Sequence, residues 1–105
     1  MSALLQKFKQ RLAAGEVLLG DGPWGTQLQT LGLDLEDCPE EWNLTHPDKV
    51  GQVARGYLQA GADFCSSNTF GANRYRLNRF GLAERLGELY RTGLALSLRA
   101  AREFG

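Results

Sequence analysis

The sequence predicts an α/β fold in which helices alternate with short buried strands. Three observations support this class: apolar residues at helical spacing, two short apolar runs that lead into polar loops, and the order in which these patterns follow one another. Of the 105 residues, 43% are hydrophobic and 23% are charged, which is typical of a globular domain. Such alternation indicates a parallel sheet connected by right-handed helical crossovers.

The chain begins with a predicted helix and a predicted strand. Leu5, Phe8 and Leu12 recur at helical spacing, and Gly15 suits the left-handed turn that follows a helix. The run EVLLG at 16–20 is short, apolar and ended by glycine. We expect it to be a strand that is buried on both faces.

A long loop at 21–45, rich in Gly, Pro and acidic residues, is expected next, and long ordered loops tend to be functional. It contains one short helical pattern, GTQLQTLG, at 25–32. Thr45 is expected to cap the following helix, with Pro47 in the first turn and Gly61 at the end. Its apolar stripe consists of Val50, Val53, Ala54, Tyr57 and Leu58.

The second half repeats the order of strand and helix. The run ADFCSS at 62–67 predicts a second strand, a polar loop is expected over 68–81, and a helix is expected from 82 to 104. We expect that helix to turn one face inward: Leu82, Leu86, Leu89, Gly93, Leu96 and Ala100.

Two parallel strands offer little surface to three helices, so we expect a partial (β/α)₈ TIM barrel. The chain supplies the N-terminal helix and the first two β/α units. Residues 1–105 are therefore predicted to be the N-terminal part of a longer barrel domain.

Charge and cysteine content exclude several partners. Twelve basic and twelve acidic residues leave no excess positive charge that would bind nucleic acid or an anionic membrane surface. No apolar stretch is long enough to span a membrane. We expect a cytoplasmic protein. Cys38, Cys65 and His46 match no zinc spacing, so no metal ligand is predicted; Cys65 is expected in the core and Cys38 in a loop.

The spacing of Gly20, Gly22 and Gly25 matches the dinucleotide-binding pattern G-x-G-x-x-G. We reject that interpretation because the helix after Gly25 is short and because residues 34–43, where the second strand would lie, are acidic and contain proline.

The alternative is that this loop lies at the carboxyl rim of a barrel strand, where barrel enzymes carry their chemistry. Asp21 can then accept a hydrogen bond from a substrate ammonium, and the backbone at Gly22, Gly25 and Thr26 can approach a carboxylate. These preferences fit an amino acid. A turn-forming role for Asp21 remains the alternative.

The second predicted strand also leads into polar residues. Asn68 and Thr69 present amide and hydroxyl groups at its end, and Phe70 can pack over a ligand or under the next helix. Ser66 and Ser67 precede them, and at most one of the two faces the barrel interior because neighbouring strand residues point to opposite faces.

Four segments resemble the homocysteine S-methyltransferase family, in particular the homocysteine-binding barrel of cobalamin-dependent methionine synthases. They are LLGDGPWGTQLQ, PEEWNLTHPDKV, YLQAGADF and SSNTFGANRYRL. The resemblance implies a TIM barrel in which the zinc-activated homocysteine thiol takes a methyl group to give methionine. It implies methyl-cobalamin as the donor, with betaine or a methylsulfonium compound as alternatives.

Carried over by residue, the resemblance places Asp21 at the substrate ammonium and the backbone from Gly22 to Thr26 at its carboxylate. Asn68, Thr69 and Phe70 are implied to line the pocket, and Ser67 stands where the family usually has threonine.

The cysteines that bind zinc in the family have no counterpart here, so zinc ligands are expected outside this chain and no catalytic residue is assigned. We expect the 105 residues alone to be inactive, with the remainder of the barrel or a second copy as partner. A self-associating binding module and a non-catalytic fragment are the alternatives.

Overall fold

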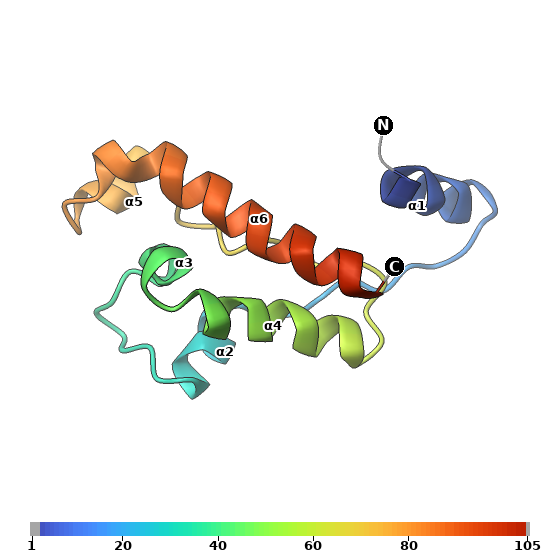
Figure 1. Cartoon of the computed structure of the whole chain (residues 1–105), viewed down its shortest axis with the longest axis horizontal. Coiled ribbons are helices and arrows are strands. Elements are labelled where there is room, and N and C mark those ends of the chain that lie inside the picture. Colours follow the sequence, from blue (N-terminus) through green and yellow to red (C-terminus); the bar gives the residue numbers. More distant parts are fainter. Residues whose placement is uncertain (1–2, 105) are drawn as a thin grey trace.

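A computed structural model describes residues 3–104, which fold into α-helices joined by loops and 3₁₀ turns (Figure 1). The elements are α1 (Ala3–Ala13), α2 (Gly25–Thr30), η1 (Pro39–Glu41), α3 (Trp42–Thr45), α4 (Pro47–Gln59), α5 (Arg74–Asn78), η2 (Ala83–Arg85) and α6 (Leu86–Phe104). Predicted helices at the N-terminus, after Gly25, after Pro47 and in the last part of the chain are confirmed. Helices α3 and α5 lie in segments that were predicted to be loops.

Helices α4 and α6 lie side by side and form the centre of the molecule (Figure 1). One cluster of buried side chains joins α2, α3 and α4: Leu28, Leu33, Trp42, Val50 and Val53. A second cluster joins the loop before η1 to α5 and α6: Cys38, Leu77, Leu82 and Leu89. The predicted inward face of the last helix is confirmed, since Leu89, Gly93 and Ala100 are buried.

The two thiols exchange their expected environments. Cys38, predicted in a loop, belongs to the second core cluster and is 2% exposed, whereas Cys65 is only partly buried. Burial raises the pKa of the Cys38 thiol, and the nearby Glu40 carboxylate adds to this effect. The prediction was wrong because packing of α5 and α6 over the loop at Cys38 is decided by residues far along the chain.

The start of α4 differs from the prediction. Thr45 is the last residue of α3, and its hydroxyl donates to the carbonyl of Glu41 at 3.3 Å instead of capping α4. His46 occupies the N-cap position without a side-chain hydrogen bond to the helix. Pro47 needs no N–H partner there, so α4 begins without a capping side chain.

The predicted strands at 16–20 and 62–67 are not strands among the described residues. A single backbone hydrogen bond joins them, from the Asp63 N–H to the Leu19 carbonyl at 2.7 Å. The Leu19 N–H donates instead to the Asp63 carboxylate at 2.8 Å, so a side chain takes the place of the next rung of a ladder. The two segments therefore lie side by side, and the partial (β/α)₈ barrel stays a prediction.

Helix α1 is attached to this junction through two contacts. The Arg11 guanidinium lies 2.9 Å from the Asp63 carboxylate, and the rings of Phe8 and Phe64 meet edge to face with centroids 5.7 Å apart. Within residues 3–104, no helix is long and apolar enough to cross a membrane.

Gly93 allows α6 to approach the segment around Asn68. A Cβ atom at this position would lie 2.7 Å from Asn43 Nδ2 and 3.1 Å from the carbonyl oxygen of Asn68. The neighbouring atom of Asn68 is backbone, so it cannot move aside easily. The helix therefore needs glycine here despite glycine's low helix propensity.

We expect Gly93→Ala to lower the free energy of unfolding by about 1–3 kcal/mol, because the added methyl group overpacks this contact. Gly56→Ala is the matched control, since a Cβ at Gly56 in α4 meets nothing within 4 Å. It should raise stability by up to about 1 kcal/mol. Urea unfolding of both variants tests this, and a stable Gly93→Ala variant contradicts the contact.

Asp63 should make stability depend on pH. Its pKa is held below the ordinary carboxyl value, first by the Leu19 N–H and then by the Arg11 guanidinium. Such a group stabilises the folded state above its unfolded pKa of about 3.9 and loses that effect as the pH falls through the lower folded value.

We therefore expect the stability difference between wild type and Asp63→Asn to be constant above about pH 5 and to shrink below about pH 4. Urea titrations at each pH measure it. An equal difference at both ends of this range is the contrary outcome.

Candidate functional site

Two loops that are far apart in the sequence meet in the structure. We call residues 20–25 the first loop and residues 66–71 the second loop. The Asp21 carboxylate joins them: Oδ2 accepts from the Ser66 N–H at 2.7 Å, and Oδ1 accepts from the Ser66 hydroxyl at 3.0 Å. Oδ2 also accepts from Trp24 Nε1 at 2.8 Å. Asp21 is therefore the link between the loops, and it also shapes its own turn.

Tyr57 supports the first loop from α4. Its hydroxyl donates to the carbonyl of Pro23 at 2.6 Å, and a Cβ on Gly22 would lie 3.0 Å from that hydroxyl oxygen. Burial raises the pKa of Tyr57, and the Asp21 charge adds to this. Sequence analysis placed Tyr57 only in an apolar stripe, because a contact with a loop 34 residues away leaves no local signal.

The main chain of the second loop is held from behind by α6 and α3. Ser97 of α6 donates to the carbonyl of Ser66 at 2.8 Å. Asn43 of α3 donates to the carbonyl of Asn68 at 3.0 Å, and Asn68 Nδ2 donates back to Asn43 Oδ1 at 2.9 Å. Asn68 is 3% exposed. The predicted site residue Asn68 thus lies in a polar interior contact.

The end of the second loop is held by a buried carboxylate. Glu40 is 3% exposed, and its Oε2 accepts from the Gly71 N–H at 3.1 Å. The Cys38 thiol lies 3.7 Å from Glu40 Oε1. A side chain on Gly71 would meet Glu40 Oε1 at 2.7 Å, so glycine is needed for this approach.

A cavity of about 490 Å³ lies between the two loops. Six predicted site residues line it: Gly22, Gly25, Ser67, Asn68, Thr69 and Phe70. Trp24 and Ser66 also line it, although sequence analysis did not select Trp24. Two predicted site residues are not part of the lining. Thr26 is exposed on α2, and Asp21 is connected to the lining by its hydrogen bonds from Ser66.

The cavity offers hydrogen-bonding groups of both kinds. Among the described residues, the backbone N–H groups of Ser67, Asn68 and Phe70 donate no hydrogen bond. Next to the lining, Asp21 accepts three hydrogen bonds, whereas an ionised carboxylate has about four acceptor positions, so Oδ1 can take one more. Phe70 is 92% exposed and stands open at the cavity rather than under a helix. The arrangement can therefore bind a small molecule that has both an anionic and a cationic group.

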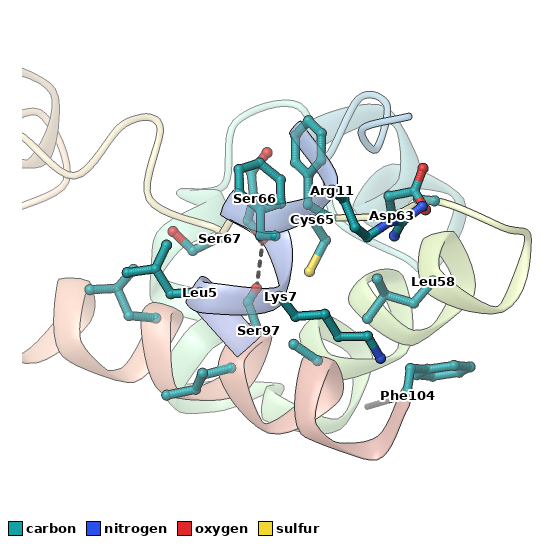
Figure 2. Close-up of a pocket in the computed structure, with 16 residues that line it drawn as sticks. Leu5, Lys7, Arg11, Leu58, Asp63, Cys65, Ser66, Ser67, Ser97 and Phe104 are labelled. Carbon is teal, nitrogen blue, oxygen red and sulfur yellow. Dashed lines mark hydrogen bonds and ion pairs between the residues drawn. The ribbon is translucent and has the colours of Figure 1, made fainter. Parts of the chain in front are cut away.

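A larger cavity of about 680 Å³ lies between α1, α6 and residues 62–67 (Figure 2). Its lining is mainly apolar, with Leu5 and Leu58 on its walls and Phe104 at its edge. Cys65 also lines it, and burial raises the pKa of that thiol. Polar side chains also line it, but Arg11 is paired with Asp63 and Ser97 donates to the carbonyl of Ser66. The smaller cavity, which has a more polar lining and lies between the two loops, is therefore the better candidate for substrate binding.

The described residues do not by themselves fit a zinc site. Within residues 3–104, no three His, Cys, Asp or Glu side chains are grouped so that they can hold a metal ion. Cys38 is packed in the second core cluster, and Cys65 lines the apolar cavity.

Comparison with known proteins places this sequence among S-methyltransferases. Residues 18–105 match the family model for homocysteine S-methyltransferase. The chain belongs to the homocysteine S-methyltransferase family, as the resemblance predicted.

Three relatives illustrate the similarity. The chain is 41% identical to methionine synthase of Mycobacterium tuberculosis over 85% of this chain and 8% of that protein. It is 34% identical to homocysteine S-methyltransferase 1 of Zea mays over 87% of this chain and 29% of that protein. It is 36% identical to betaine–homocysteine S-methyltransferase 1 of Xenopus tropicalis over 69% of this chain and 18% of that protein. The chain thus spans less than a third of the length of each.

The link made by Asp21 can be tested with Asp21→Asn. The amide nitrogen cannot accept a hydrogen bond, so the variant cannot keep all three bonds. If the amide oxygen replaces Oδ2 the bond from the Ser66 hydroxyl is lost, and if it replaces Oδ1 the bonds from the Ser66 N–H and Trp24 are lost, so we expect unfolding to become easier by about 1–3 kcal/mol. Amide hydrogen exchange over residues 62–70 should become faster. Asp37→Asn is the control, because the Asp37 carboxylate accepts only from the Asp34 N–H at an exposed turn. Equal exchange in both variants contradicts the link.

Proposed function

We propose that these residues form part of the homocysteine pocket of a methyltransferase that converts homocysteine to methionine. The observation that carries the proposal is the polar cavity between the two loops, which lies within the residues that match the family. Homocysteine has an ammonium, a carboxylate and a short chain that ends in a thiol. An amino acid of this kind needs an acceptor, several donors and an apolar contact close together.

The described residues supply each of these groups. Asp21 Oδ1 is the proposed acceptor for the ammonium, since it has an acceptor position left. We assign the carboxylate to backbone N–H groups of the second loop and of the segment from Gly22 to Thr26, other than Pro23, which has none, with Ser67 and Thr69 hydroxyls nearby. These two hydroxyls lie 2.7 Å apart, so they share one proton and leave one free to donate. Phe70 is the proposed contact for the methylene groups.

We propose that residues 16–20 and 62–67 are the first two strands of a (β/α)₈ barrel. The hydrogen bond from Asp63 to Leu19 supports this, as does the position of a functional loop directly after each segment. We propose that the remainder of such a barrel packs against the residues that line the apolar cavity beside α1. Self-association of this chain is the alternative, and it too is expected to cover that cavity.

The metal and the methyl donor are proposed from the family resemblance. Zinc favours the deprotonated form of a bound thiol, which is the nucleophile that this reaction needs at neutral pH. Its ligands are assigned outside the described residues, because no suitable cluster occurs within them. Methyl-cobalamin is the proposed donor, and betaine or a methylsulfonium compound is the alternative. The longer and closer match to methionine synthase supports this order.

Calorimetry on the full-length protein with zinc tests the proposed pocket. We expect heat of binding with L-homocysteine and at least about tenfold weaker binding of 4-mercaptobutyrate, because that compound lacks the ammonium that Asp21 accepts from. Absence of homocysteine binding would falsify the proposal.

The purified 105-residue chain is expected to form no methionine with any of the three donors, and turnover by it contradicts the assignment of the zinc ligands.

A further inference from the structure

We propose that Asn43 and Glu40 are positioning residues that hold the second loop in the shape that binds homocysteine. The inference rests on the proposed function of the cavity. Neither residue lines the cavity; both lie behind the loop, in α3 and η1, where they are 1% and 3% exposed. They act on the ligand only through the loop.

Asn43 determines how the Asn68 amide is turned. Asn68 Nδ2 donates to Asn43 Oδ1 at 2.9 Å and to the carbonyl of Pro39 at 2.8 Å, so both amide hydrogens are directed away from the cavity. Asn68 Oδ1 accepts no hydrogen bond from the described residues. Every side-chain nitrogen or oxygen atom that is fully buried among them has a hydrogen-bond partner, so an oxygen without one is not fully buried. This oxygen is therefore accessible, and since Asn68 lines the cavity, the acceptor end of its amide faces the ligand.

Asn43 also holds the second loop next to α6. Its own Nδ2 donates to the carbonyls of Asn68 and of Leu89, both at 3.0 Å. One side-chain amide thus joins the loop, α3 and α6. A buried amide that makes three hydrogen bonds has one preferred position, because any other leaves polar groups without partners.

Glu40 holds the far end of the same loop. Its Oε2 accepts from the Gly71 N–H at 3.1 Å, immediately after Phe70. With Asn68 and Gly71 both held from behind, the N–H groups of Ser67, Asn68 and Phe70, which donate no hydrogen bond among the described residues, keep their place in the loop that lines the cavity. If either contact is lost, only a fraction of the molecules have the binding shape, and the apparent Kd rises by the inverse of that fraction.

The test measures homocysteine affinity by calorimetry in the full-length protein with four substitutions. Asn43→Leu and Glu40→Ala should each raise the Kd about tenfold. Glu40→Gln keeps an oxygen that can accept from Gly71, so its Kd should stay within about twofold of wild type. Val50→Ala is the control: it removes buried volume from the first core cluster, lowers the melting temperature, and should leave the Kd unchanged.

Hydrogen exchange without ligand provides a second measurement. Asn43→Leu and Glu40→Ala should speed amide exchange at Thr69 and Gly71, the two residues between 67 and 71 whose N–H groups donate hydrogen bonds, whereas Glu40→Gln and Val50→Ala should not. If Asn43→Leu does not fold, the two Glu40 variants still decide the matter.

The outcomes separate the two proposals. If wild type binds no homocysteine, the proposed function fails and this inference falls with it. If wild type binds homocysteine but Asn43→Leu and Glu40→Ala behave like Val50→Ala, the positioning role alone is overturned.

Discussion

Hydrogen bonds from side chains hold the second loop in place, and the candidate site depends on them. Asp21 accepts from Ser66, while Asn43 donates to the carbonyl of Asn68 and Glu40 accepts from the Gly71 N–H. A sheet can hold a loop through repeated backbone pairs that almost any sequence can make. Here each contact requires a particular side chain, and those of Asn43 and Glu40 are buried, so the geometry of the cavity is specific to these residues.

The helices provide the platform on which these contacts are made. Helices α4 and α6 pack together at the centre, and glycine at position 93 lets α6 come close to the second loop. The two cavities on this platform differ in chemistry. The one between the loops is lined by Ser66, Ser67, Asn68 and Thr69, with the Asp21 carboxylate next to it through Ser66, whereas the one beside α1 is mainly apolar. This contrast separates a place for a charged small molecule from a surface suited to further packing.

Local patterns predicted the helices better than the other elements. Apolar spacing and terminal glycines are properties of neighbouring residues, so α1, α2, α4 and α6 could be found from them. Helix α5 was missed although Asn73 caps it by accepting from the Arg76 N–H at 3.0 Å, a signal that the sequence carries. The two predicted strands depend on partners along their whole length, and an apolar run does not specify those partners.

The sequence by itself determined the family, the main helices and the two loops that carry polar residues, because these are written in local motifs and their order. Only the tertiary structure decided that Asp21 accepts three hydrogen bonds from Ser66 and Trp24, and that Asn43 accepts a hydrogen bond from the Asn68 amide. It also decided that Cys38, rather than Cys65, lies in the core. The Asn43–Asn68 and Asp21–Ser66 contacts join residues 25 and 45 positions apart, so no local pattern reveals them, and the energy of the buried Asn43–Asn68 contact depends on the packing around it.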